Sequence, residues 1–189
     1  MIQTSDEGYA LAGYTTDPFP SSGESSFWLV KTDSFGNMQW NKTYGGPYWD
    51  IAYSLIQTSD EGYALAGYTQ LIYGTPASLE FWLVKTDSSG NMQWNQTYGG
   101  TNWDEAHSVI QTSDGGYALA GYTYSYGAGT PTWTNFWLVK TDSPGNELWN
   151  QTYGGNYDDR AYSLVQTSDR GYALAGYTSS YGAGSADFW

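Results

Sequence analysis

The sequence predicts an all-β protein built from a repeated unit, and two recurring segments carry this prediction. The segment FWLVKTDSSGNMQWNQTYGG at 81–100 returns with few changes at 27–46 and 136–155. A second segment, IQTSDEGYALAGYT, starts at Ile56 and has copies that start at Ile2, Ile110 and Val165. Successive starts are 54, 54 and 55 residues apart. A fixed period of this length indicates a repeat architecture, either a propeller or a solenoid.

Each repeat is expected to contain four short strands joined by turns. The fourth strand alternates, with Met92, Trp94 and Tyr98 on one side and polar residues on the other, which is typical of a half-buried strand. The third strand is apolar on both faces, so it is expected to be buried on both. Turn sequences such as Asp114-Gly115 separate the strands. In the second copy the expected strands are 52–58, 62–69, 81–87 and 92–98.

Four strands in a repeat of about 50 residues are typical of a β-propeller blade. The string FWLVKTDSSGNMQWNQTYGG, followed by DEAHSVIQTSDGGYALAGYT, resembles the repeats of secreted and cell-surface β-propellers of bacteria and archaea. It is similar to the SBBP-type family of seven-bladed propellers, over essentially the whole chain. The resemblance implies an extracellular or cell-surface location, and that family supplies no catalytic residues to carry over.

The domain organisation expected is one array of propeller-type repeats over 1–189. About 3.5 repeats are present, so we expect an incomplete propeller whose open ends allow self-association. The repeat boundaries are approximately 1–48, 49–102, 103–157 and, in part, 158–189.

The composition excludes several classes of function. Six Lys and Arg against nineteen Asp and Glu give a formal net charge of −13, which argues against nucleic acid as a partner. No apolar run approaches about 18 residues, so we expect no membrane insertion. The chain has no cysteine and one histidine, His107, which excludes a cysteine-ligated or His-rich zinc site. His107 lies where other copies have tyrosine and is expected to be a packed side chain.

The long loops between second and third strands are the candidate binding elements. They differ between copies, at 16–26, 70–80 and 124–135, and together with the connections between repeats they should occupy one face of the array. Aromatic side chains on loops stack on sugars or anchor a protein partner. Trp49 and Trp103 also lie on this face, but we favour packing between blades for them. The candidate ligand-binding residues are Tyr73, Tyr124, Tyr126 and Trp133.

An aspartate precedes each repeat's first strand, at Asp50, Asp104 and Asp159. Carboxylates that converge near a propeller axis could bind Ca²⁺. The favoured alternative is structural, with each carboxylate accepting backbone N–H groups of the adjoining loop. Ca²⁺ is therefore a candidate cofactor, and no other cofactor is expected.

Three Asn-x-Thr sequons recur on the polar side of the fourth strand, at Asn41, Asn95 and Asn150. They predict a glycoprotein if the chain is exported in a host that glycosylates proteins. The alternative is that these side chains are polar edge residues.

The leading functional prediction is a non-catalytic extracellular binding or adhesion scaffold. It would recognise glycan or protein through the face that carries the variable loops. One alternative is a propeller-type glycoside hydrolase or lyase, since loop carboxylates are present. A second alternative is a structural component of a surface layer.

Overall fold

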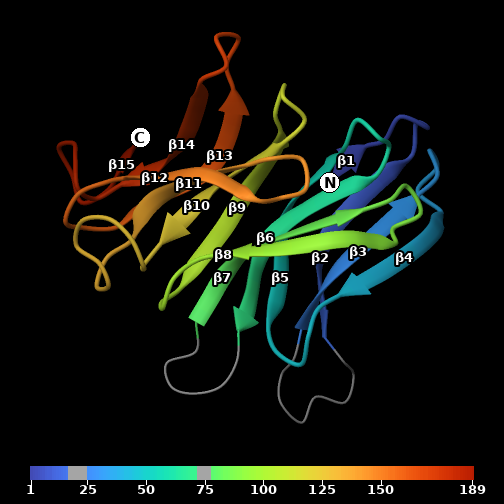
Figure 1. Cartoon of the computed structure of the whole chain (residues 1–189), viewed down its shortest axis with the longest axis horizontal. Helices are drawn as coiled ribbons and strands as arrows, with labels where there is room; N and C mark the ends of the chain where they lie inside the picture. The colour runs from blue at the N-terminus through green and yellow to red at the C-terminus, as the bar shows by residue number, and fades with distance from the viewer. Residues whose placement is uncertain (17–24, 72–77) are drawn as a thin grey trace.

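The fold is known from a computed structural model that describes residues 1–16, 25–71 and 78–189 (Figure 1). These residues form fifteen strands, and no helix occurs among them. The strands make three antiparallel sheets of four strands and one of three, each in sequence order. The all-β prediction with four-stranded repeats is therefore confirmed. Within the described ranges no helix is long and apolar enough to cross a membrane.

Each sheet is a meander of consecutive strands. The first contains β1 (Ile2–Gln3), β2 (Tyr9–Thr16), β3 (Ser25–Thr32) and β4 (Met38–Tyr44). The second contains β5 (Asp50–Gln57), β6 (Tyr63–Leu71), β7 (Ser78–Thr86) and β8 (Met92–Tyr98). The third contains β9 (Asp104–Gln111), β10 (Tyr117–Thr123), β11 (Asn135–Thr141) and β12 (Glu147–Tyr153). The fourth contains β13 (Asp159–Gln166), β14 (Tyr172–Thr178) and β15 (Asp187–Phe188).

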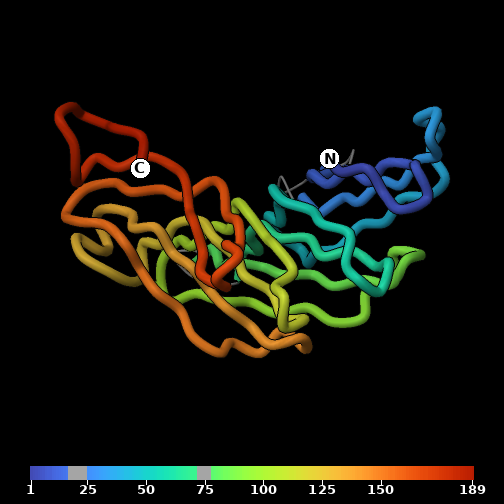
Figure 2. The backbone as a smooth tube through the Cα atoms, turned by 90° about the horizontal axis from the view of Figure 1, so that it is seen from above, coloured from blue at the N-terminus to red at the C-terminus, as the bar shows by residue number. Residues whose placement is uncertain are grey.

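The four sheets follow one another in an open arc, with the N-terminal sheet at one end and the C-terminal sheet at the other (Figure 2). The first strands of neighbouring sheets, β5, β9 and β13, contact one another. This arrangement is that of an incomplete β-propeller. Because strands alternate in direction, the β5–β6 and β9–β10 turns lie at one end of the sheets, and the β4–β5 and β10–β11 connections lie at the opposite end (Figure 1).

The core lies between successive sheets and repeats with the sequence. Phe81 and Tyr98 of the second sheet pack against Tyr117, Leu119 and Trp137 of the third, and all five are at most 5% exposed. β7 and β11 are buried on both faces, as predicted, because the second and third sheets each have a neighbour on either side, whereas Trp28 of β3 in the first sheet is 38% exposed. The equivalent residues between the first and second sheets are Phe27, Tyr44, Tyr63, Leu65 and Trp82.

A buried lysine ties each complete sheet together, and sequence analysis did not anticipate it. Lys85 is only 4% exposed, and its Nζ donates to Asp60 Oδ2 (2.8 Å), to the Thr86 carbonyl (2.8 Å) and to Gln93 (3.0 Å). The ion pair joins the turn between the first two strands to the third strand. The same pair recurs as Lys31–Asp6 and Lys140–Asp114. The sequence does contain a signal for this ion pair, because the same Lys and Asp are retained in every full copy of the repeat.

A tyrosine hydroxyl joins the first sheet to the second and another joins the second to the third, and we expect loss of either bond to destabilise the protein. The Tyr98 hydroxyl donates to the Gly145 carbonyl (2.7 Å), as Tyr44 does to Gly90. Tyr98→Phe keeps the ring but removes this buried bond, so the free energy of unfolding should fall by about 1 kcal/mol. Tyr153→Phe is the matched control, because that residue is 41% exposed. Urea unfolding of both variants checks this, and equal effects would contradict it.

Candidate functional site

The third repeat carries a pocket on the face formed by the connections between second and third strands and between successive sheets, called here the variable face. The pocket has a volume of about 270 Å³. Its lining combines the loop before β9 with the loop after β10. The lining residues are Asn102, Trp103, Tyr124 and Pro131.

Asp104 positions both loops that form the pocket. Its Oδ2 accepts the backbone N–H of Gly100 (2.9 Å) and the hydroxyl of Ser125 (2.8 Å). Its Oδ1 accepts the hydroxyl of Thr123, at the end of β10. The side chain is buried, and burial raises the pKa of this carboxyl group, although the hydrogen bonds oppose the shift. Asp104 therefore clamps the loop before β9 onto the loop after β10.

The other two aspartates make the same kind of clamp in their own sheets. Asp159 accepts the Gly155 N–H (2.9 Å) and the Ser180 hydroxyl (2.7 Å), and Asp50 accepts the Gly46 N–H (2.9 Å). These bonds are the structural role favoured from the sequence. Within the described ranges no three His, Cys, Asp or Glu side chains lie close enough together to hold a metal ion. The Ca²⁺ prediction thus has no geometric support there.

The two aromatic rings of the pocket stand nearly perpendicular to each other. The Tyr124 N–H donates to the Trp103 carbonyl (2.9 Å), and the ring centroids are 6.4 Å apart at 84°. Trp103 is 52% exposed, its backbone bridges Leu79 of the second sheet, and its ring meets Tyr124 in the loop of its own sheet. Packing of its ring between blades, favoured from the sequence, stays a prediction. Asn102 is held beside it, with its N–H donating to the Ser125 hydroxyl (3.1 Å).

Of the four predicted aromatic residues, the structure describes three, and it does not bring those three into one site. Tyr124 lines the pocket, whereas Trp133 packs against Tyr157 (centroids 5.8 Å apart). The Tyr126 hydroxyl donates to the Gly99 carbonyl (2.7 Å), and its ring lies 5.4 Å from Trp137. Tyr73 lies outside the described residues.

Tyr126 belongs to a loop motif that occurs twice. The segment Ser-Tyr-Gly-Ala-Gly at 125–129 returns at 180–184. Tyr181 repeats the geometry of Tyr126, with its hydroxyl donating to the Gly154 carbonyl (3.1 Å) and its ring against Trp189. The loops after β10 and β14 therefore share this segment. Beyond residue 129 the loop of the third repeat differs in sequence from the other.

A charged cluster lies beneath the pocket and was missed in the sequence. Arg160 Nη2 donates to the Tyr124 hydroxyl (3.3 Å), and the guanidinium group lies 4.5 Å from the centroid of the Tyr122 ring. Glu105 occupies the equivalent position of β9, and burial raises the pKa of its carboxyl group while the hydroxyls of Tyr122 and Tyr53 oppose the shift. The signal was available, because the three repeats differ at this position: Ile51, Glu105 and Arg160.

His107 is packed among aromatic rings, as predicted. Its ring stacks on Tyr53 (centroids 4.5 Å apart, 17°) and lies 5.0 Å from Tyr162. Burial and the charge of Arg160 lower its pKa to about 4, so the imidazole is neutral near pH 7. Its Nε2 is buried without a hydrogen-bond partner and lies 3.7 Å from Glu105 Oε2.

The sequon asparagines share a structural role on the fourth strand of each complete sheet. Each accepts the indole N–H of the tryptophan on the adjacent strand: Trp28 to Asn41 (3.2 Å), Trp82 to Asn95 (3.1 Å) and Trp137 to Asn150 (3.1 Å). All three asparagines are exposed. The hydrogen bond explains why Asn recurs, and glycosylation stays a prediction.

Searches against models of protein families and against curated proteins find no match to this sequence. The resemblance to secreted propeller repeats therefore stays a prediction.

Proposed function

We propose that the protein is a non-catalytic binding scaffold that recognises an uncharged glycan in the pocket of the third repeat. The observation that carries this proposal is the corner formed by the rings of Trp103 and Tyr124, with Asn102 beside them. Flat aromatic faces pack against the C–H faces of sugar rings, and an amide group can orient their hydroxyls. A volume of about 270 Å³ suits a small ligand better than a protein surface.

The charge of the chain narrows the class of glycan. A formal net charge of −13 repels acidic sugars and leaves neutral ones favoured. The one cation close to the pocket, within the part of the chain that the structure describes, is Arg160, and its guanidinium group is engaged with Tyr124 and Tyr122. It therefore orders the pocket wall.

Two features support binding without catalysis. Glu105 of the charged cluster and His107 beside it have side chains only 13% and 16% exposed. The imidazole is enclosed by three tyrosine rings. A general acid or base must reach the proton it transfers, and both groups are covered. The extracellular or cell-surface setting is part of the proposal and rests on the resemblance to secreted propeller repeats.

Replacing Trp103 or Tyr124 by alanine should abolish most of the glycan affinity. Loss of one buried aromatic anchor costs about 2 kcal/mol, or roughly thirtyfold in affinity. Trp49→Ala is the matched control, because Trp49 has the same position in the preceding repeat. Its carbonyl accepts the N–H of Gln70, whereas the Trp103 carbonyl accepts the N–H of Tyr124, so the second aromatic ring is missing there. The measurement is a screen on an array of neutral oligosaccharides, followed by titration calorimetry with the best binder.

Three results would overturn the proposal. The first is the absence of binding to any neutral oligosaccharide on the array. The second is an equal loss of affinity in the Trp49→Ala and Trp103→Ala variants. The third is hydrolysis or elimination of the bound sugar during the titration, which would establish the enzymatic alternative.

A further inference from the structure

The pocket of the third repeat carries two polar groups on an otherwise apolar lining. The rings of Trp103, Tyr124 and Pro131 supply the apolar surface. The polar groups are the side-chain amide of Asn102 and the hydroxyl of Tyr124. The volume of about 270 Å³ lies just below the range of about 300–1,000 Å³ that is typical of pockets for drug-sized ligands, so it suits one sugar residue with its substituents. The two polar groups therefore decide which substituent fits.

Asn102 offers a hydrogen-bond acceptor. Its Nδ2 donates to the Tyr124 carbonyl (3.4 Å) and to the Thr101 hydroxyl (3.4 Å). Because a carbonyl oxygen only accepts, the amide nitrogen must be the atom that faces it. The remaining amide atom, Oδ1, accepts from no donor in the part of the chain that the structure describes. It is thus available to an N–H or O–H group of a ligand.

Tyr124 offers a hydrogen-bond donor. Its hydroxyl oxygen accepts from Arg160 Nη2 (3.3 Å), and the Tyr122 ring holds the guanidinium group at 4.5 Å. A hydroxyl group that accepts from a cation keeps its own hydrogen and donates it more strongly, because the charge polarises the O–H bond. Among the described residues no atom accepts this hydrogen. A ligand carbonyl would therefore complete the bonding of the Tyr124 hydroxyl.

An acetamido group is the complement of this lining. Its N–H donates to Asn102 Oδ1, its carbonyl accepts from the Tyr124 hydroxyl, and its methyl group covers apolar surface of Trp103 and Pro131. A sugar hydroxyl carries its donor and acceptor on one atom and leaves that apolar surface in water. A protonated amino group has donors only, so the Tyr124 hydrogen would stay unpaired.

We propose that the pocket recognises the acetamido group of a neutral N-acetylated sugar. This inference rests on the proposed function, to which it adds the substituent that is read. Arg160 is a positioning residue, because it orients the Tyr124 hydroxyl without touching the sugar. The uncharged amide also suits a chain whose formal net charge is −13.

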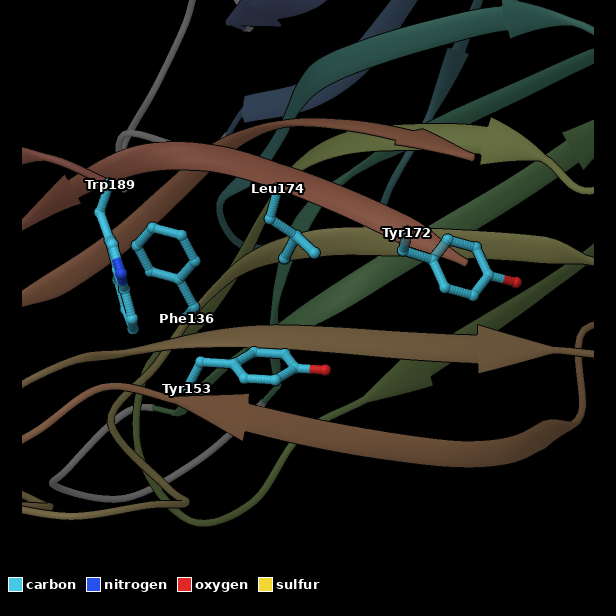
Figure 3. A pocket seen from close by; sticks show the side chains of 5 residues that line it. All are labelled: Phe136, Tyr153, Tyr172, Leu174 and Trp189. Atoms are coloured by element: carbon cyan, nitrogen blue, oxygen red, sulfur yellow. The ribbon is translucent and has the colours of Figure 1, made fainter. Parts of the chain in front are cut away.

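A second hollow, with a volume of about 300 Å³, lies between the third and fourth sheets (Figure 3). It is lined by Phe136, Tyr153, Tyr172, Leu174 and Trp189. The residues at the same positions one repeat earlier are Phe81, Tyr98, Tyr117, Leu119 and Trp137, and these form core between two sheets. This hollow therefore belongs to the packing of the sheets, and the ligand is placed at Trp103 and Tyr124.

The test compares three trisaccharides of β-1,4-linked glucose units that differ only at carbon 2, which carries a hydroxyl, an acetamido or an ammonium group. Calorimetry at physiological ionic strength suppresses unspecific attraction of the cationic sugar. We expect the acetamido sugar to bind about tenfold tighter than the hydroxyl sugar. If the oligosaccharide array selects another backbone, the three substituents are compared on that backbone.

Variants of the two polar groups should reduce this preference and not merely the affinity. Asn102→Ala and Tyr124→Phe each remove one hydrogen bond to the acetamido group, so each should lower the preference about fivefold. Arg160→Met should lower it less, since the hydroxyl remains but loses its orientation. Tyr181→Phe is the control, because it removes a loop hydroxyl that donates to the Gly154 carbonyl, away from the pocket, and should leave the preference unchanged.

The outcomes separate this inference from the proposed function. A preference for the acetamido sugar that falls in the Asn102→Ala and Tyr124→Phe variants supports it. Equal binding of the hydroxyl and acetamido sugars, tighter binding of the ammonium sugar, or a preference that survives both substitutions would overturn the inference and leave glycan binding standing. Absence of binding to every neutral oligosaccharide would remove both.

Discussion

Replacing Gly121 by alanine is expected to disrupt the third sheet. Gly121 lies in β10 at a break in register, where it pairs with Ala106 while Ala120 pairs with Ser108. A Cβ at this position would lie 1.9 Å from the Glu105 carbonyl oxygen and 2.9 Å from the Ala106 Cα. Both are backbone atoms that cannot rotate away, so β9 must move. We expect the free energy of unfolding to fall by about 3 kcal/mol or more.

Gly13 provides the matched control, because it holds the same position in the first sheet. A Cβ there would meet nothing within 4 Å, since β1 pairs with β2 only through Ile2 and Gln3. Gly13→Ala should therefore change stability by less than about 1 kcal/mol. Chemical unfolding of both variants checks the difference. A Gly121→Ala protein as stable as Gly13→Ala would contradict the close approach of β9 to β10.

Removing Asp60 should destabilise the second sheet, because it leaves the Lys85 ammonium buried without its counter-ion. A buried charge that loses its partner typically costs about 3–5 kcal/mol, but the Asp60 side chain is 55% exposed and solvent screens the pair. We therefore expect Asp60→Ala to lower the free energy of unfolding by about 2 kcal/mol. Thermal and urea unfolding give the value.

The Asp169→Ala variant distinguishes the stability contributed by the ion pair from that contributed by the hydrogen bonds of the turn. Asp169 accepts the Gly171 N–H (3.1 Å) and a threonine hydroxyl, as Asp60 accepts from Gly62 and Thr58, but it pairs with no lysine of the described residues. Its replacement should cost about 1 kcal/mol at most. Similar losses in the two variants would show that the turn, and not the ion pair, is responsible.

The dependence of stability on acidic pH gives a second measure of this ion pair, which in the first sheet joins Lys31 to Asp6. The hydrogen bond from Lys31 lowers the pKa of Asp6 to about 2. A carboxyl group with a lowered folded-state pKa contributes stability above its unfolded pKa of about 4, and this contribution is lost as the pH falls through 2. Wild-type stability should decline over this interval, and Asp6→Ala should show a smaller decline.

The sequence was sufficient for the fold because the repeat presents each strand several times. Strand β7 reads as apolar on both faces, and Phe81, Trp82, Leu83 and Val84 are indeed at most 7% exposed. The roles of the aspartates at the start of β5, β9 and β13 were also within reach, because Asp in a turn usually accepts backbone N–H groups.

The site was less accessible, because it depends on contacts between loops that no local pattern describes. The meeting of Trp103 with Tyr124 depends on how Asp104 joins two loops 21 residues apart. The Lys85–Asp60 pair was missed for a similar reason, since it spans 25 residues. Periodicity identifies the face of a strand, but it does not identify which polar side chains meet across turns.

Hydrogen exchange with and without a bound neutral oligosaccharide tests most directly whether recognition belongs to the variable face of the third repeat. Ligand should slow exchange at 101–103 and 124–131 and leave the opposite turn at 112–116 unchanged. The clamp at Asp104 predicts that both loops respond together, because it joins them. Protection confined to the turn at 112–116, or to the equivalent turn at 58–62, would contradict the account.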